Sequence, residues 1–199
     1  MAVITNKRHL KEAVAFAADR RGIAAVEFAL LLPVMAILFF GMLEASDLFT
    51  VNRRLASATN ALVDLAAQEP SITIAEVDDL IIGVTRILEP SNTSTVTMKL
   101  VSVTRGSAAN SPVLVHWSRD ETGNTPYTVG QTYDKLSDDE SLKPGQSLVI
   151  SEIGYHYDSG LTGFVISIPF DFNHRAARWP RKSNKVQLCQ DANISSCTT

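Results

Sequence analysis

The sequence lacks the features that would suggest an enzyme or a nucleic-acid-binding protein. Its 199 residues carry 18 basic and 21 acidic side chains, a formal net charge of −3, so there is no basic excess to attract a phosphate backbone. It contains no nucleophile elbow, no glycine-rich phosphate loop and no acidic metal motif. We therefore expect no catalytic activity, no cofactor and no nucleic-acid partner.

Residues 23–43 form a long apolar run, IAAVEFALLLPVMAILFFGML, in which Glu27 is the one ionisable residue. About 21 residues is roughly the length of a helix that crosses the hydrocarbon core of a bilayer. A cleaved secretory signal is the competing interpretation. It requires a shorter apolar run of about 7–15 residues and an Ala-x-Ala-like site, which the sequence LEA at 43–45 fits poorly. The run predicts a transmembrane helix.

Basic residues flank this span unequally. Those before it are Lys7, Arg8, Lys11, Arg20 and Arg21, whereas Arg53 and Arg54 are the ones that follow it closely. This asymmetry predicts a cytoplasmic N-terminus. Residues 1–22 are then a cytoplasmic leader, and residues 44–199 are an exported domain that holds both cysteines, Cys189 and Cys197. In an oxidising compartment such a pair predicts a short-loop disulfide, with free thiols as the alternative.

The helical pattern continues beyond the span. Apolar residues three and four positions apart occur at Leu48, Val51, Leu55, Ala58, Leu62 and Leu65. We expect one helix from near residue 23 to about residue 67, apolar on all sides in its first half and amphipathic in its second. Pro70 ends it. The sequence Thr73-Ile-Ala-Glu76 has the form of a capping box and predicts a second helix, which stops at Glu89-Pro90.

From residue 92 onward the apolar period changes to two. Four segments rich in β-branched and aromatic residues predict strands: TVTMKLVSV, VLVHWS, SLVISEIGYHY and FVISIPFDF. A fifth short strand is expected at KVQLC, and residues 119–145 are expected to form a long polar loop. The order of elements predicts an α+β fold: a long N-terminal transmembrane helix that continues into an amphipathic helix, a second helix, and an antiparallel sheet of about four or five strands.

Glu27 needs an explanation, because a carboxylate at the centre of a transmembrane helix costs about 2.5–3.5 kcal/mol, and less near an end. It could simply lie close enough to the interface to reach water. Alternatively, a peptidase could cut after Gly22, which would give Ile23 a free amine with a pKa of about 8. Glu27 would then be the fifth residue of the new chain. Its carboxylate could pair with the amine of a neighbouring copy, where burial removes the screening that weakens exposed pairs.

The sequence Arg20-Arg21-Gly22-Ile23-Ala-Ala-Val-Glu27-Phe28, followed by an apolar run, resembles the prepilin-peptidase site and hydrophobic stem of type IV pilins. It is most similar to the TadE-like minor pilins, or pseudopilins, of the tight-adherence (Tad, or Flp) system. Similar stretches occur at 54–60, 117–118, 147–157 and 179–189. The major Flp pilins usually have Glu-Tyr where this chain has Glu-Phe. With the large exported domain, this difference resembles the pseudopilin class.

The resemblance implies a precursor held in the bacterial inner membrane, with its C-terminal domain in the periplasm, and cleaved by a prepilin peptidase. Gly22 and Ile23 would form the cleavage site, and Glu27 and Phe28 would serve assembly. The implied partners are other pilin and minor-pilin subunits and the inner-membrane pilus platform. The mature protein would enter the extracellular pilus or be required for its assembly.

Other residues suggest weaker sites. The basic tail around Trp179-Pro180, including Arg178, Arg181 and Lys182, is a candidate contact for a partner subunit or an anionic surface, with a solvated turn as the alternative. Three aromatic residues of the predicted strands, Trp117, Tyr155 and Tyr157, are expected to pack in the core, with an adhesive surface as the alternative.

The three histidines after the span, His116, His156 and His174, show no spacing typical of a metal site, and the first two are expected on the surface of a sheet. Two other function classes stay open. One is an uncleaved single-pass anchor that displays a domain binding an envelope polymer. The other is a membrane-anchored hydrolase that uses His116, His156 or Asp158.

Overall fold

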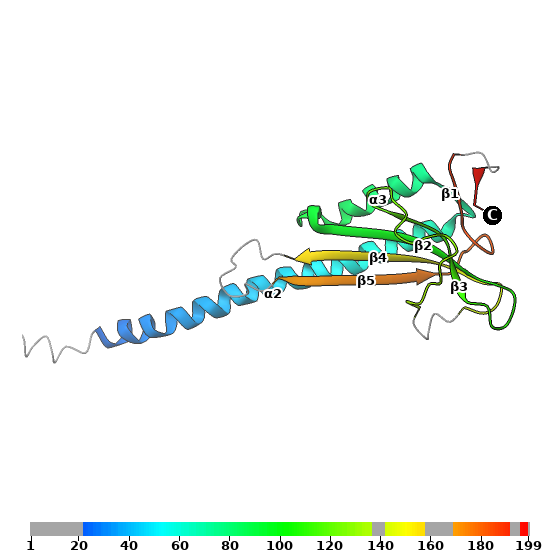
Figure 1. Ribbon diagram of the computed structural model, residues 1–199. Coiled ribbons are helices and arrows are strands. Elements are labelled where there is room, and N and C mark those ends of the chain that lie inside the picture. Colours follow the sequence, from blue (N-terminus) through cyan, green and yellow to red (C-terminus); the bar gives the residue numbers. More distant parts are fainter. Residues whose placement is uncertain (1–21, 137–141, 158–168, 192–195, 199) are drawn as a thin grey trace, which may run out of the picture.

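The computed structural model describes residues 22–136, 142–157, 169–191 and 196–198. A long helix, α2 (Ile23–Gln68), projects with its first half alone, while its second half lies beside α3 (Ile74–Leu88) and a sheet (Figure 1). We call residues 23–43 the stem and the described residues from 44 onward the head. The predicted α+β order of a long apolar helix, a second helix and an antiparallel sheet is confirmed.

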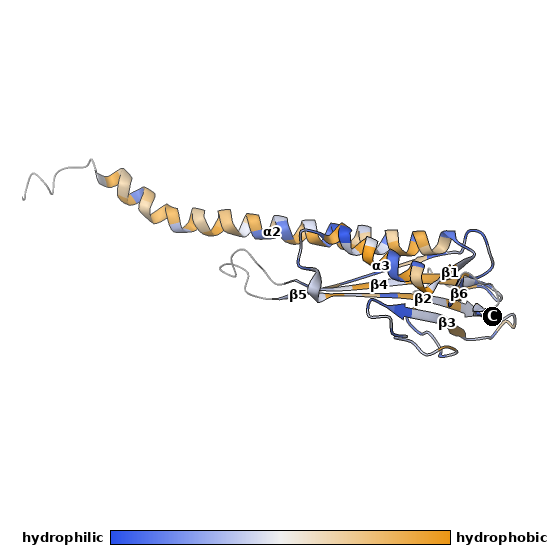
Figure 2. Cartoon of the chain, turned by 90° about the horizontal axis from the view of Figure 1, so that it is seen from above, coloured by the Kyte–Doolittle hydropathy of each residue, from blue (hydrophilic) through white to orange (hydrophobic). Residues whose placement is uncertain are grey.

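Helix α2 continues from its apolar half into its amphipathic half without interruption (Figure 2). Its ends, Ile23 and Gln68, are close to the predicted ends near residue 23 and about residue 67. Pro33 lies inside the helix and does not end it. The helix stops at Glu69, whose backbone is extended, because Pro70 disfavours the helical conformation in the residue before it. The two halves therefore form one continuous helix.

The half of α2 within the head buries one broad face, made of Val51, Leu55, Ala58, Thr59, Leu62, Val63, Ala66 and Ala67. The prediction that Leu65 belongs to this face is wrong, since Leu65 is 45% exposed. At about 100° per residue, Leu65 lies about 60° to one side of Leu62, past the edge of the buried face. Val63 and Ala67 extend that face in the other direction.

Helix α3 begins at the predicted capping box. The Thr73 hydroxyl accepts a hydrogen bond from the Glu76 amide at 3.2 Å, and the Glu76 carboxylate accepts one from the Thr73 amide at 2.8 Å. The helix buries Val77, Ile81, Val84 and Leu88. Asp78 fastens it to the sheet by accepting two hydrogen bonds from Arg119, at 2.6 and 2.8 Å. These bonds lower the pKa of the Asp78 carboxyl.

The sheet contains β2 (Val96–Arg105), β3 (Val113–Asp120), β4 (Ser147–Tyr157) and β5 (Phe170–Arg178), in the order β3-β2-β4-β5. All neighbouring pairs are antiparallel. The inner face packs on α2 and α3 and carries Met98, Leu100, Trp117, Ile153, Tyr155 and Tyr157 in the core. The expectation that the three aromatic residues pack inside is confirmed.

The outer face of the sheet has a second, smaller core. It consists of Val101, Val103, Val115, Leu148 and Ile150 under Tyr133 and Leu142. The last two residues lie in the segment expected to be a polar loop, so that expectation is wrong in part. The segment looked polar because Gly, Pro, Asp and Asn residues surround Tyr133 and Leu142. The sequence did not show that apolar residues on the outer face of the sheet would be buried by this segment.

Two strands differ from the predicted ones. The strand expected at FVISIPFDF is observed as β5, which starts at Phe170 and continues to Arg178, while residues 164–168 lie outside the described part. It extends into the basic segment because its alternate residues Phe172, His174 and Ala176 face α2. The fifth strand, β6 (Gln187–Cys189), does not join the main sheet: it pairs in parallel with β1 (Ser71–Thr73).

Candidate functional site

The stem exposes apolar side chains on all sides. Its large apolar residues, from Ile23 to Leu43, are between 39% and 73% exposed. The helix is long and apolar enough to cross a membrane by length and composition, and none of its most apolar window is buried in the head. Such a surface is stable in lipid or against other apolar helices. These properties are consistent with a single-pass membrane anchor.

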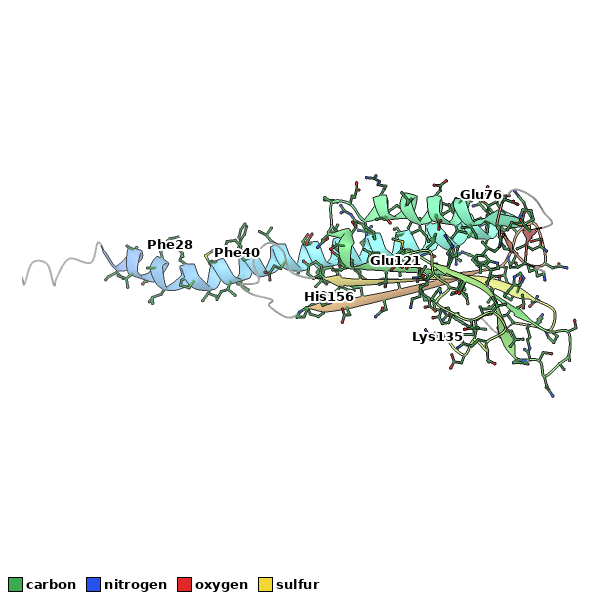
Figure 3. The ribbon with its side chains drawn as sticks, turned by 45° about the horizontal axis from the view of Figure 1, so that its top comes forward. Phe28, Phe40, Glu76, Glu121, Lys135 and His156 are labelled. Carbon is green, nitrogen blue, oxygen red and sulfur yellow. A yellow bond between two sulfur atoms is a disulfide. The ribbon has the colours of Figure 1, made fainter. Side chains whose placement is uncertain are left out.

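Glu27 lies on the first part of the stem, beside Phe28 (Figure 3). It follows Ile23 by four residues, which is about 6 Å along a helix axis. Its side chain is exposed, and within the described residues it has no hydrogen bond or ion pair. The stem therefore carries one carboxylate about one turn from its start, with no intramolecular partner there.

Gly22 immediately precedes α2. Its backbone angles, φ −86° and ψ −11°, are open to any residue. A Cβ atom added at this position would meet no atom within 4 Å. The fold of the described residues thus gives no steric or conformational reason for a glycine at position 22.

The junction between stem and head is tied to the sheet. Tyr157, at the end of β4, donates a hydrogen bond to the Asp47 carboxylate on α2 at 2.8 Å. Burial and this carboxylate raise the pKa of the Tyr157 phenol well above its ordinary value. On β5, the His174 ring lies 2.7 Å from the Asn52 side-chain oxygen. Glu44, which is buried on the same part of α2, was not singled out from the sequence.

The basic tail lies along α2. Arg178 donates to the Asn60 side chain at 2.8 Å, Arg181 pairs with Asp64, and Lys182 lies 3.2 Å from Glu69. The Arg181 backbone amide also donates to the Ala67 carbonyl. These contacts fasten the tail to the helix, although the Arg181 and Lys182 side chains remain 56% and 59% exposed. Contact with a partner subunit stays a prediction.

The helix that carries these features can be compared with known families. Residues 22–64 match the family of TadE-like proteins. The match agrees with the resemblance noted from the sequence and indicates involvement in Tad pilus systems. This is a structural, non-enzymatic family. Neither a curated protein nor a solved structure matched the chain.

The TadE-like segment contains Gly22, the whole stem, and the amphipathic half of α2 as far as Asp64. It stops before α3 and the sheet. The residues of the predicted cleavage and assembly site therefore all lie inside the TadE-like segment, whereas the basic tail lies outside it and contacts it through Arg178 and Arg181.

Outside the TadE-like segment, Glu152 is the centre of a polar cluster on the outer face of the sheet. It accepts hydrogen bonds from the Tyr127 and Tyr133 phenols at 2.8 and 2.6 Å, and Lys135 donates to the Tyr127 oxygen at 2.7 Å. Burial, followed by the Glu152 carboxylate, raises the pKa of Tyr133 far above its ordinary value. The cluster borders a pocket of about 280 Å³. No local sequence pattern predicts this cluster, because its members come from distant segments.

The three histidines of the head, all within the described residues, do not converge. His156 lies 2.6 Å from the Asp171 carboxylate on the surface, and His174 contacts α2. His116 is buried, contrary to the expectation of a surface position. It is the extra residue of a β-bulge, because Trp117 pairs with Ser102 while Val115 pairs with Val103. Within the described residues no group of His, Cys, Asp or Glu could hold a metal ion, and Asp158 lies outside them.

A disulfide joins Cys189 and Cys197 at the end of the head far from the stem. The Thr198 amide donates to the Leu188 carbonyl at 2.8 Å, and the Leu188 amide donates to the Thr198 hydroxyl at 3.1 Å. The bridge thus holds the C-terminal residues beside β6, which pairs with β1 ahead of α3.

Proposed function

We propose that this protein is a minor pilin or pseudopilin that takes part in assembly of a Tad (Flp) type IV pilus. In this proposal residues 1–22 are a cytoplasmic leader, residues 23–43 hold the precursor in the bacterial inner membrane, and residues 44–199 form the periplasmic domain. The observation that carries the proposal is a continuous helix whose exposed apolar half begins directly after Gly22 and bears one carboxylate, Glu27.

The proposed maturation step is cleavage between Gly22 and Ile23 by a prepilin peptidase. The absence of a steric or conformational reason for glycine at position 22 within the described fold supports a role in recognition by the peptidase. Cleavage would leave the Ile23 amine at the tip of a helix that already begins at this residue. No refolding of the stem would be needed.

The proposed role of Glu27 is to accept the Ile23 amine of a neighbouring stem. The two groups are separated by about 6 Å along the axis, so parallel stems offset by about that distance would bring them together. An ion pair formed in an apolar surrounding is strong only when both partners are present, since either charge alone is costly to bury. Phe28, on the same turn, would add apolar contact between the stems.

The proposed partners are other pilin and minor-pilin subunits, the prepilin peptidase and the inner-membrane pilus platform. The fastening of β4, β5 and the basic tail to α2 supports a head that moves with its stem as one body. The protein would enter the extracellular pilus or act in its assembly, without catalysing a reaction.

The N-terminal residue of the mature protein tests the proposal. Mass spectrometry of membrane-extracted protein should show a chain that begins at Ile23. Gly22→Ala should retain the leader, whereas the control Gly83→Ala, at an exposed and uncrowded position in α3, should mature normally. A functional protein that keeps Met1 would exclude the proposal and favour an uncleaved anchor that displays a binding domain.

A further inference from the structure

Two hollows lie along the seam where α2 and α3 pack together. The hollow nearer the stem measures about 280 Å³ and is lined by Arg53, Arg54 and Ile87, among others. The farther one measures about 310 Å³ and has Leu65 and Leu80 in its wall. Leu65 and Ile87 are exposed large apolar residues. The seam therefore offers apolar surface that contacts within the chain do not cover.

The two hollows carry opposite charge. Arg53 and Arg54 line the near hollow. Beside it, next to the lining residue Ile87 in the sequence, Arg86 pairs with Glu89 at 2.9 Å, and the Glu89 carbonyl accepts from Arg54 at 3.0 Å. Three cations and one carboxylate leave an excess of two positive charges there.

The charged residues that line the far hollow are Glu69, Glu76 and Asp79, and Lys182 pairs with Glu69. This leaves an excess of two negative charges. Glu76 lies at the end of α3 that is distant from Phe28 and Phe40 on the stem (Figure 3). The seam is therefore basic near the membrane anchor and acidic away from it.

The hollows belong to one continuous surface. On α2, Arg54 and Leu65 are separated by about three helical turns, and on α3, Ile87 and Leu80 are separated by about two. Their centres are therefore about 15 Å apart along the helix axes. Between them lie the small residues Ala61 on α2 and Gly83 on α3, and an added Cβ at Gly83 would meet no atom within 4 Å. Another helix can approach closely here.

We propose that the α2/α3 seam docks a second copy of this chain, displaced by about 15 Å along the stem. The inference rests on the proposed function, because stems incorporated in one pilus would run parallel and could be displaced along its axis. Parallel copies at equal height place like charges together, and only an axial offset brings the arginines of one copy to the acidic hollow of the other. The alkyl part of Arg53 then lies on Leu65 and Leu80 while its guanidinium meets Asp79.

This contact pairs the basic hollow of one copy with the acidic hollow of the other and is therefore heterologous. Its offset differs from the about 6 Å that would pair Glu27 with an Ile23 amine. The two contacts would thus join one copy to different neighbours in an assembly.

Charge reversal tests the docking surface. Arg53 and Asp79 are exposed and have no hydrogen bond or ion pair within the described residues, so Arg53→Glu and Asp79→Arg should fold normally. Self-association of the full chain is measured by sedimentation equilibrium in a non-ionic detergent, where stems are not held at one height. Each variant should weaken association by about fivefold. The control Lys143→Glu, at an exposed position on another loop, should leave it unchanged.

Restoration by pairing is the decisive result. The doubly substituted chain, and an equimolar mixture of the two single variants, should recover the association of the unmodified chain, because the reversed surfaces are again complementary. Failure of both to recover, or association unaffected by either single change, would overturn the inference. The mass of the same samples reports leader cleavage independently, so a failure of the proposed maturation is distinguishable from a failure of docking.

Discussion

Replacement of Leu62 by alanine should destabilise the head far more than the same replacement at Leu65. Leu62 is 0% exposed in the core between α2 and the sheet, whereas Leu65 is 45% exposed. Loss of three buried carbons and the resulting cavity gives about 2–5 kcal/mol for Leu62→Ala. At Leu65 about half of the transfer free energy applies and no closed cavity forms, which gives about 1 kcal/mol.

The assay is urea unfolding of the full chain in a non-ionic detergent, followed by tryptophan fluorescence. A Trp179→Phe background leaves the buried Trp117 as the reporter of the core. With a slope of about 2 kcal/mol per molar urea, Leu62→Ala should lower the midpoint by at least about 1 M and Leu65→Ala by about 0.5 M. Equal shifts, or a larger shift for Leu65→Ala, would refute the assigned packing face of α2.

Three further outcomes are expected. Glu27→Ala should leave leader cleavage largely intact and reduce incorporation into pili, counted by electron microscopy; unchanged piliation would contradict charge pairing between stems. Asp78→Asn should cost about 0.5–1 kcal/mol of unfolding free energy at neutral pH, because Asp78 binds Arg119 and is 42% exposed. The folded-state pKa of Asp78 is lowered, so this stabilisation is present above about pH 4 and is lost as the pH falls through the folded pKa; urea titrations at several pH values check this. Reduction of Cys189–Cys197, which closes a loop with a sequence separation of 8, should cost about 2.5 kcal/mol by loop entropy and should speed amide hydrogen exchange in β6 before the main sheet opens.

Features with a strong local signal were predicted from the sequence. The stem helix and its continuation follow from composition and a helical period, and α3 follows from the Thr73–Glu76 capping box, which the structure contains. β2, β3 and β4 follow from alternating apolar residues. Each of these signals acts between residues a few positions apart, so it can be recognised without knowledge of the fold.

Features that depend on distant residues were missed. The bulge that buries His116 is defined by pairing with β2. The course of β5 through the basic segment depends on Phe172 and Ala176 packing on the helix layer. The pairing of Lys182 with Glu69 joins residues more than a hundred positions apart. A single sequence does not show which distant side chains will become neighbours.

The proposed cleavage and assembly residues belong to the first group, since Gly22, Ile23 and Glu27 lie within six consecutive positions. The docking seam belongs to the second. In the sequence, Arg53 served only to predict the orientation of the span and Asp79 was not singled out. Their places at opposite ends of the seam follow from the antiparallel packing of α2 on α3.

The sequence by itself determined that a long apolar helix begins after Gly22, that it carries one carboxylate, and that an α+β domain follows. Chain composition and short-range periodicity suffice for this, because they set the free energy of helix formation and of transfer into lipid. Tertiary structure alone decided where the buried face of α2 ends, with Leu65 outside it, and where the basic and acidic ends of the α2/α3 seam lie. Those properties arise from contacts that exist only after distant segments have packed together.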